Sequence, residues 1–173
     1  MGQISALTST PEEEEAIFEA FRPKVKGTNI DEQTLLATDY LNHFNEVVML
    51  FDMLADMPEL IEDCRAWQPR SYEDHFRQST FSDRDLAVEA YGKVPSRFRV
   101  PFEETIRQIN ELILSSTDRL EQEINAGSDP EILRHIGGSV SRAAQVLMDH
   151  ASAIIHGSSQ TMDQDEIDTM IGK

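Results

Sequence analysis

Hydrophobic side chains recur along this chain at intervals of three and four residues, which is the period of an amphipathic α-helix. The pattern predicts three long helices, over residues 29–57, 102–126 and 129–155. The apolar positions that define them are Leu36, Tyr40, Phe44, Val47, Phe51 and Leu54; Phe102, Ile106, Ile109, Ile113, Leu120 and Ile124; and Leu133, Ile136, Val140, Ala143, Leu147, Ala151 and Ile154. We find no strong strand signal, so we expect an all-α fold.

The two later helices should form a long antiparallel hairpin, because only a tight turn at Gly127 and Ser128 separates them. Ser128 and Glu131 have the spacing of a capping box that restarts the chain. The helix over 129–155 is rich in glycine, alanine and serine, so a neighbouring helix can approach it closely. Packed with the helix over 29–57, this hairpin predicts a helical bundle. Long hairpins also complete a four-helix core with a second copy, which makes a homodimer an alternative.

Turn and cap residues divide the chain into three parts. A capping box from Thr10 to Glu13 predicts a short helix in an N-terminal arm over residues 1–28. The helical bundle follows over residues 29–157. The polar stretch HGSSQ then leads into a flexible C-terminal peptide over residues 158–173.

The middle of the bundle, residues 68–100, is expected to be irregular. A proline at position 58 stops the first long helix, and a short helix can follow over residues 58–67. Another short helix is predicted over residues 85–91, where a glycine ends it. Prolines then punctuate residues 93–101, which we expect to form a loop before the second long helix.

The chain of 173 residues is strongly acidic, with a formal net charge of −17. This charge argues against nucleic acids and anionic membranes as partners, because both require a positive surface. It favours basic protein partners, or it serves only solubility. Eight basic and seven acidic side chains lie within residues 65–107, and we expect these arginines to pair with the acidic helices around them. No apolar run is long enough to span a membrane, and no signal peptide is recognisable. With Cys64 as the single cysteine, a cytoplasmic location is expected.

A metal site is one candidate for chemistry. Asp39, His43 and Glu46 are spaced four and three apart, so they share one side of the expected first long helix. A carboxylate–histidine–carboxylate group facing a bundle interior can hold iron, manganese or zinc. His43 could also accept a phosphoryl group, or it could be a polar residue at a helix interface. The segment has no resemblance to a known phosphotransfer box.

Aromatic and basic side chains alternate over residues 91–102, with sequence YGKVPSRFRVPF. In a basic protein this pattern would indicate contact with nucleic acid, but the global charge opposes that interpretation. A docking patch for an acidic peptide fits better, and the chain's own C-terminal peptide is one such peptide.

The last residues, TMDQDEIDTMIGK, combine acidic side chains with an apolar edge. Ile167, Met170 and Ile171 fall at i, i+3 and i+4, so they share one side of a short helix. An amphipathic helix of this kind binds in the groove of a partner, and it should be largely unformed in isolation. The predicted partner-binding residues are Asp165, Glu166, Ile167, Asp168, Met170 and Ile171.

This segment resembles the acidic peptide by which the chemotaxis phosphatase CheZ and the flagellar switch protein FliM bind the response regulator CheY. The resemblance implies a regulatory protein of chemotaxis or two-component signalling whose partner, a CheY-like receiver domain, carries any Mg²⁺. CheZ-like phosphatases use an acidic residue and a glutamine four positions later, and the nearest pair here is Glu104 and Gln108. These lie about 200–240° around the helix from Phe102, which predicts a solvent-facing position. The sequence DFQDLTGQ is absent, and a metal-binding enzyme centred on residues 39–46 or a structural adaptor are the alternatives.

Overall fold

The computed structural model describes residues 9–158 and 162–172, and its regular structure in these ranges is helical throughout. Within them the α-helices are α1 (Pro11–Phe21), α2 (Asn42–Met53), α3 (Ile61–Ala66), α4 (Tyr72–Gln78), α5 (Arg84–Tyr91), α6 (Ser96–Asn125), α7 (Pro130–Ile155) and α8 (Gln164–Met170). Short 3-10 helices are η1 (Arg22–Val25), η2 (Thr38–Leu41) and η3 (Pro58–Leu60). The all-α prediction is confirmed. None of the helices in the described ranges is long and apolar enough to cross a membrane.

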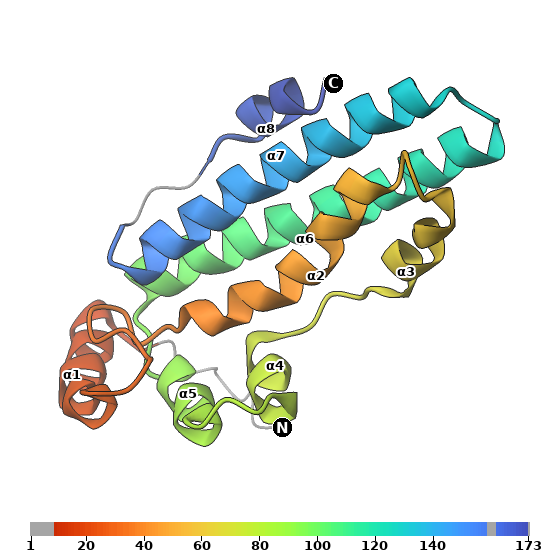
Figure 1. Ribbon diagram of the computed structural model, residues 1–173. Helices are drawn as coiled ribbons and strands as arrows, with labels where there is room; N and C mark the ends of the chain where they lie inside the picture. Colours follow the sequence, from red (N-terminus) through yellow and green to blue (C-terminus); the bar gives the residue numbers. More distant parts are fainter. Residues whose placement is uncertain (1–8, 159–161, 173) are drawn as a thin grey trace, which may run out of the picture.

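The two longest helices, α6 and α7, form the predicted antiparallel hairpin, and α2 packs alongside α7 (Figure 1). The small residues of α7 permit a very close approach to α2. A Cβ atom added to Gly137 would lie 2.3 Å from the backbone oxygen of Phe51. The side chains of Ser141 and Asp52 are hydrogen-bonded beside this contact, at 2.9 Å. The expectation that small residues bring a neighbouring helix close is therefore correct.

The shorter helices α1, α4 and α5 gather at the end of the bundle where α6 begins (Figure 1). Two glutamates of α1 hold the first turn of α6. The carboxylate of Glu14 accepts hydrogen bonds from the backbone N–H and the hydroxyl of Ser96, at 2.9 and 2.7 Å. Arg97 forms an ion pair with Glu15 at 2.5 Å. The acidic run of α1 therefore supplies hydrogen-bond acceptors to the first turn of α6. It also lies at the N-terminus of α1, the positive end of that helix dipole.

The first long helix is shorter than the predicted range of residues 29–57. In the structure the chain folds irregularly before η2, and α2 begins only at Asn42. Leu35 has a left-handed backbone with φ of 67°, which an α-helix does not allow. The hydroxyl of Thr34 accepts the Leu36 N–H and donates to the carbonyl of Ile155, so side-chain hydrogen bonds replace helical ones.

The start of α6 differs from its predicted start by several residues. The expected loop over residues 93–101 is helical from Ser96 onward, and α6 includes Pro101. A proline within a helix removes one hydrogen bond to the preceding turn. Here Phe98 and Phe102 are buried on either side of Pro101, and the contacts from α1 hold the first turn in place. Tertiary packing therefore outweighs the local preference.

Two further local predictions need correction. The stretch expected to be irregular contains α4, whose N-cap Ser71 accepts the backbone N–H of Asp74. The cap of α7 is Asp129, which accepts the N–H of Glu131, whereas Ser128 donates its hydroxyl to Glu123. The N-cap of α1 is as predicted, because the Thr10 hydroxyl accepts the backbone N–H of Glu13.

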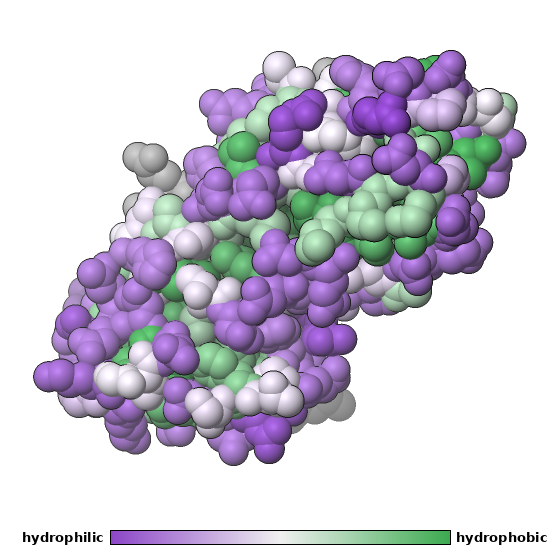
Figure 2. All heavy atoms as spheres, viewed as in Figure 1, coloured by the Kyte–Doolittle hydropathy of each residue, from purple (hydrophilic) through white to green (hydrophobic). Residues whose placement is uncertain are grey.

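The face shown in Figure 2 is mostly hydrophilic, with apolar side chains gathered over the C-terminal half of α2. Met49 and Met53 lie four residues apart on that helix and are exposed. The buried side chains form one continuous core that runs from the three long helices into the cluster of α1, α4 and α5.

Candidate functional site

The C-terminal segment forms a short helix, α8, with its own N-terminal cap. Asp163 accepts the backbone N–H of Asp165 at 2.9 Å, which satisfies one of the free donors at the helix start. Gln164 donates to Asp168 one turn later, at 3.1 Å. These local bonds explain why the acidic sequence starts a helix at Gln164.

The apolar edge of α8 faces the chain's own bundle. Ile167 and Ile171 are buried, and Met170 is half-buried against the core. The predicted i, i+3, i+4 edge is therefore present, but residues 162–172 are packed against the hairpin rather than free. Residues 159–161 of the expected flexible peptide, and the first eight residues of the expected N-terminal arm, lie outside the described residues.

Two hydrogen bonds join this segment to α6. The Gln108 side-chain amide donates to the carbonyl of Met162 at 2.9 Å. The guanidinium of Arg119 donates to the carbonyl of Ile171 at 3.5 Å. Both bonds end on backbone oxygens, so neither depends on the acidic side chains of α8.

The acidic side chains of α8 take no part in this docking. Asp165, Glu166 and Asp168 form no ion pair with any described residue. Asp168 instead lines a groove of about 400 Å³ together with Glu111 and Asp118 of α6. Glu111 is paired with Arg107, so Asp168 and Asp118 are the groove's carboxylates without an ion pair among the described residues. Docking on the bundle thus gives the acidic side chains of α8 no cationic partner there.

The predicted catalytic pair, Glu104 and Gln108, is not displayed together on the surface. Gln108 is buried beneath Met162, and its side-chain oxygen has no hydrogen-bond partner. Glu104 is bound by Arg107, whose guanidinium lowers the pKa of that carboxyl group. The solvent-facing prediction for Gln108 is wrong, because a segment from the end of the chain covers that side of α6.

Among the described residues, no hydrogen bond or ion pair joins the basic segment 91–102 to α8; the bonds to α6 come from Gln108 and Arg119 instead. Arg97 pairs with Glu15, and Arg99 donates to the carbonyl of Tyr91 while lying 4.9 Å from the centre of its ring. These arginines thus hold α6 to α1 and α5. The expectation that they pair with surrounding acids is correct for Arg97, and also for Arg65 with Glu121.

The residues of the predicted metal site have separate partners. The His43 ring is stacked on Trp67 at 4.7 Å, and its Nε2 is bonded to the carbonyl of Gln68 at 3.0 Å. Asp39 bonds to Nε2 of His75 at 2.9 Å, and Glu46 is exposed. Across the part of the chain that the structure describes, no three His, Cys, Asp or Glu side chains form a group suited to a metal ion.

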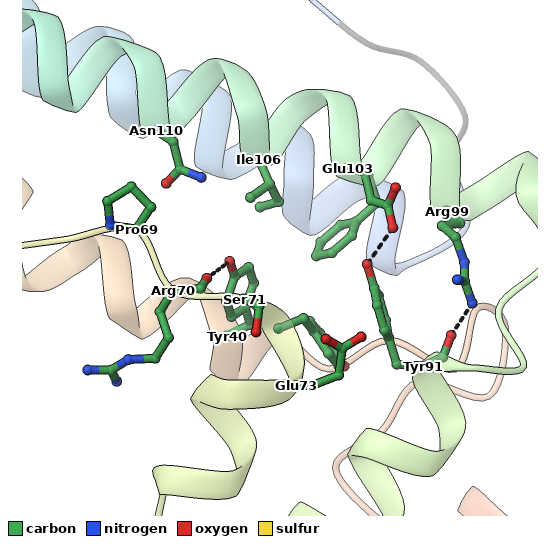
Figure 3. A pocket seen from close by; sticks show the side chains of 12 residues that line it. Tyr40, Pro69, Arg70, Ser71, Glu73, Tyr91, Arg99, Glu103, Ile106 and Asn110 are labelled. Carbon is green, nitrogen blue, oxygen red and sulfur yellow. Dashed lines mark hydrogen bonds between the residues drawn. The ribbon is translucent and has the colours of Figure 1, made fainter.

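A second candidate site is a cleft of about 410 Å³ between α6 and the helices α4 and α5 (Figure 3). All three tyrosines of the chain line it, and Tyr72 is stacked on Tyr91 with ring centres 4.4 Å apart. The Tyr91 hydroxyl donates to Glu103 at 2.7 Å, and the Tyr40 hydroxyl donates to the carbonyl of Arg70 at 2.5 Å. Burial, followed by the nearby carboxylates, raises the pKa of Tyr91, so this hydroxyl stays protonated and remains a donor.

No pattern in the sequence predicts this cleft. Its tyrosines come from η2, α4 and α5, and they are 32 and 19 positions apart along the chain. Periodicity within one helix cannot show that three separate elements meet. Only the packing of α4 and α5 against the first half of α6 brings these rings together.

Comparison of the chain with family models, with curated proteins and with solved structures finds no match. A functional assignment must therefore rest on the chemistry of the two sites themselves.

Proposed function

We propose that this chain is a regulatory protein that binds a CheY-like receiver domain through the C-terminal helix α8. The observation that carries the proposal is the unequal use of the two sides of α8. The bundle buries Ile167 and Ile171, whereas Asp165, Glu166 and Asp168 have no cationic partner in the described structure. An acidic side chain that has no cationic partner on its own bundle is available to a basic surface of another protein.

Electrostatics favour the exchange of α8 between the bundle and a partner. Asp118 shares the groove with Asp168, so release from the bundle separates these two like charges. The cost of release comes mainly from exposing two isoleucines, each of which stabilises the docked state by about 1.5–3 kcal/mol. A partner that offers an apolar groove and positive charge would recover this cost.

The proposed activity is binding, without a hydrolysis step. Glu104 is engaged by Arg107, and Gln108 lies beneath Met162, so the two do not form an exposed pair while α8 is docked. The metal-enzyme alternative draws no support from the positions of Asp39 and His43, because each is bonded to a different neighbour.

Calorimetric titration of the full chain with a CheY-like receiver domain tests the proposal. The receiver is used with and without beryllofluoride, a mimic of its phosphoryl group, and binding should be tighter with the mimic. Changing Asp165→Asn, Glu166→Gln and Asp168→Asn together should weaken binding by about tenfold, as three exposed ion pairs are lost. These acids do not take part in docking, so the fold is retained.

A matched control removes three exposed acids far from α8, with Glu12→Gln, Glu62→Gln and Glu89→Gln. The control has the same net charge as the α8 variant and should bind within about twofold of the wild type. If both variants weaken receiver binding equally, only the net charge of the chain matters and not the position of the acids in α8. No binding by the wild-type chain to any such receiver would refute the proposal.

A further inference from the structure

We propose that the tyrosine-lined cleft binds a ligand with a primary ammonium group on a short aliphatic stem and a second N–H donor beyond it. The cleft, of about 410 Å³, has the size of small-molecule sites, and it lies between three helices rather than on a flat surface. This proposal is independent of α8, whose groove has no lining residue in common with the cleft.

Two carboxylates would hold the ammonium group. Glu103 projects from α6 and Glu73 from α4, and Figure 3 shows both beside the ring of Tyr91. Neither carboxylate forms an ion pair with a residue of the described ranges. Two negative groups brought from different helices to one cleft repel each other, and a bound cation relieves that repulsion.

Arg70 and Arg99 also line the cleft, but neither forms an ion pair with Glu73 or Glu103. The guanidinium of Arg99 is held by the carbonyl of Tyr91 and lies against that ring. The side chain of Arg70 points away from the cleft in Figure 3. The carboxylates of Glu73 and Glu103 are therefore the charged groups left available to bind a cation in the cleft.

The remaining lining residues would contact the aliphatic stem and the second N–H donor of the ligand. Ile106 and Phe102 of α6 give the cleft an apolar side, against which methylene groups can pack. Asn110 follows one turn beyond Ile106, and its side-chain oxygen is buried without a hydrogen-bond partner. A buried acceptor of this kind is costly unless a ligand or water bonds to it. An N–H group at the far end of the stem would satisfy it.

Two sources can provide this chemistry: a free alkyl diamine and a lysine side chain with its backbone amide. The first probe is 1,4-diaminobutane, titrated into the full chain by calorimetry in phosphate buffer, which contains no competing amine. We expect saturable binding to one site, and no measurable binding of 1,4-butanediol, which lacks the charge. N-acetyl-lysine methylamide is the second probe, and the probe that binds with the higher affinity identifies the source of the ligand.

The variants Glu103→Gln and Glu73→Gln should each weaken diamine binding by about tenfold or more, because each removes one charge-assisted hydrogen bond. Glutamine keeps an oxygen that can accept the Tyr91 hydroxyl, so the local fold is maintained. The matched control is Glu104→Gln, on the next residue of α6, where the carboxylate pairs with Arg107 instead. This control should bind within about twofold of the wild type.

A last comparison tests the orientation of the ligand. Asn110→Leu should weaken the binding of 1,4-diaminobutane more than the binding of butylamine, because butylamine has no second N–H donor. Equal weakening by Glu103→Gln and Glu104→Gln would show that the amine responds only to the acidic surface, and it would overturn the site. Absence of saturable binding by both probes would do the same. Circular dichroism melting of each variant confirms that it is folded.

Discussion

The imidazole rings of His43 and His75 lie within the aromatic core, with ring centres 6.4 Å apart. Each ring uses Nε2 for a hydrogen bond, and each has a buried Nδ1 without a partner among the described residues. The His43 pKa is lowered, first by burial and then by the nearby positive charge of Arg70. The sequence marked His43 as a possible ligand, but its surroundings favour a neutral ring that packs against Trp67.

This environment makes the stability of the fold depend on pH. Because His43 has a lower pKa in the folded chain than in the unfolded chain, the unfolded chain binds the proton more readily. The free energy of unfolding should therefore decrease as the pH falls below about 6.5, the ordinary histidine value. Urea unfolding between pH 5 and 7.5 measures this slope. In His43→Gln the slope should be shallower, whatever the overall stability of the variant.

The control for this prediction is His135→Gln, which removes an exposed imidazole from α7. It should keep the wild-type slope. Identical slopes for wild type and His43→Gln would show that other groups, such as the carboxylates bound by arginines, account for the pH dependence.

Helix packing depends on the first of two adjacent glycines in α7. Gly137→Ala would place its Cβ atom 2.3 Å from the backbone oxygen of Phe51, which cannot move without shifting α2. We expect a loss of about 1–3 kcal/mol in the free energy of unfolding, the usual effect of overpacking. Thermal or urea unfolding of the purified variant measures this loss.

Gly138→Ala is a matched control in the same turn. Its Cβ atom would meet only the end of the flexible Arg142 side chain, at 3.2 Å. Alanine is favoured over glycine within a helix by about 1 kcal/mol, so this variant should be as stable as the wild type or more stable. If both variants lose the same stability, the close contact between α2 and α7 is not what requires Gly137.

Another prediction about helix packing concerns the docked position of α8. Gln108→Ala removes the hydrogen bond to Met162, worth about 1 kcal/mol, so the released form of α8 should become about fivefold more populated. Backbone amides of residues 164–171 should then exchange with solvent faster by a similar factor. A receiver domain that binds only released α8 should also bind more tightly, as the proposed function requires.

Gln122→Ala controls for the loss of a glutamine from α6, because that side chain is exposed. It should leave the exchange of α8 unchanged. Unchanged exchange in Gln108→Ala would mean that the bond to Met162 does not hold the segment, and that the buried isoleucines suffice.

Elements with a strong local pattern were predictable, and those set by distant contacts were not. The α6–α7 hairpin follows from periodicity and a tight turn, both of which are local. The apolar pattern before Asn42 also looked helical, but the Thr34 hydroxyl bonds to Ile155, more than a hundred residues away. In the same way, Pro101 remains within α6 because α1 packs at its start, and Gln108 is covered by the end of the chain.

At the scale of the whole molecule, the two sites that we propose on this acidic chain would both bind cationic groups. The acidic face of α8 and the carboxylates of Glu73 and Glu103 come from unconnected parts of the sequence. The α8 residues were predictable because they adjoin one another in the sequence. The cleft was not, because residues from four elements (η2, α4, α5 and α6) meet there only after folding.

The end of α7 is fixed to the bundle, because Thr34 bonds to the Ile155 carbonyl and Asp31 bonds to the His156 ring. Five residues, 158–162, then separate Gly157 from Asp163. Even fully extended, this tether reaches only about 20 Å. Released α8 therefore stays at a high effective concentration near its own groove, and it rebinds quickly unless a partner captures it. A partner that does so is itself held within the same short radius of the bundle.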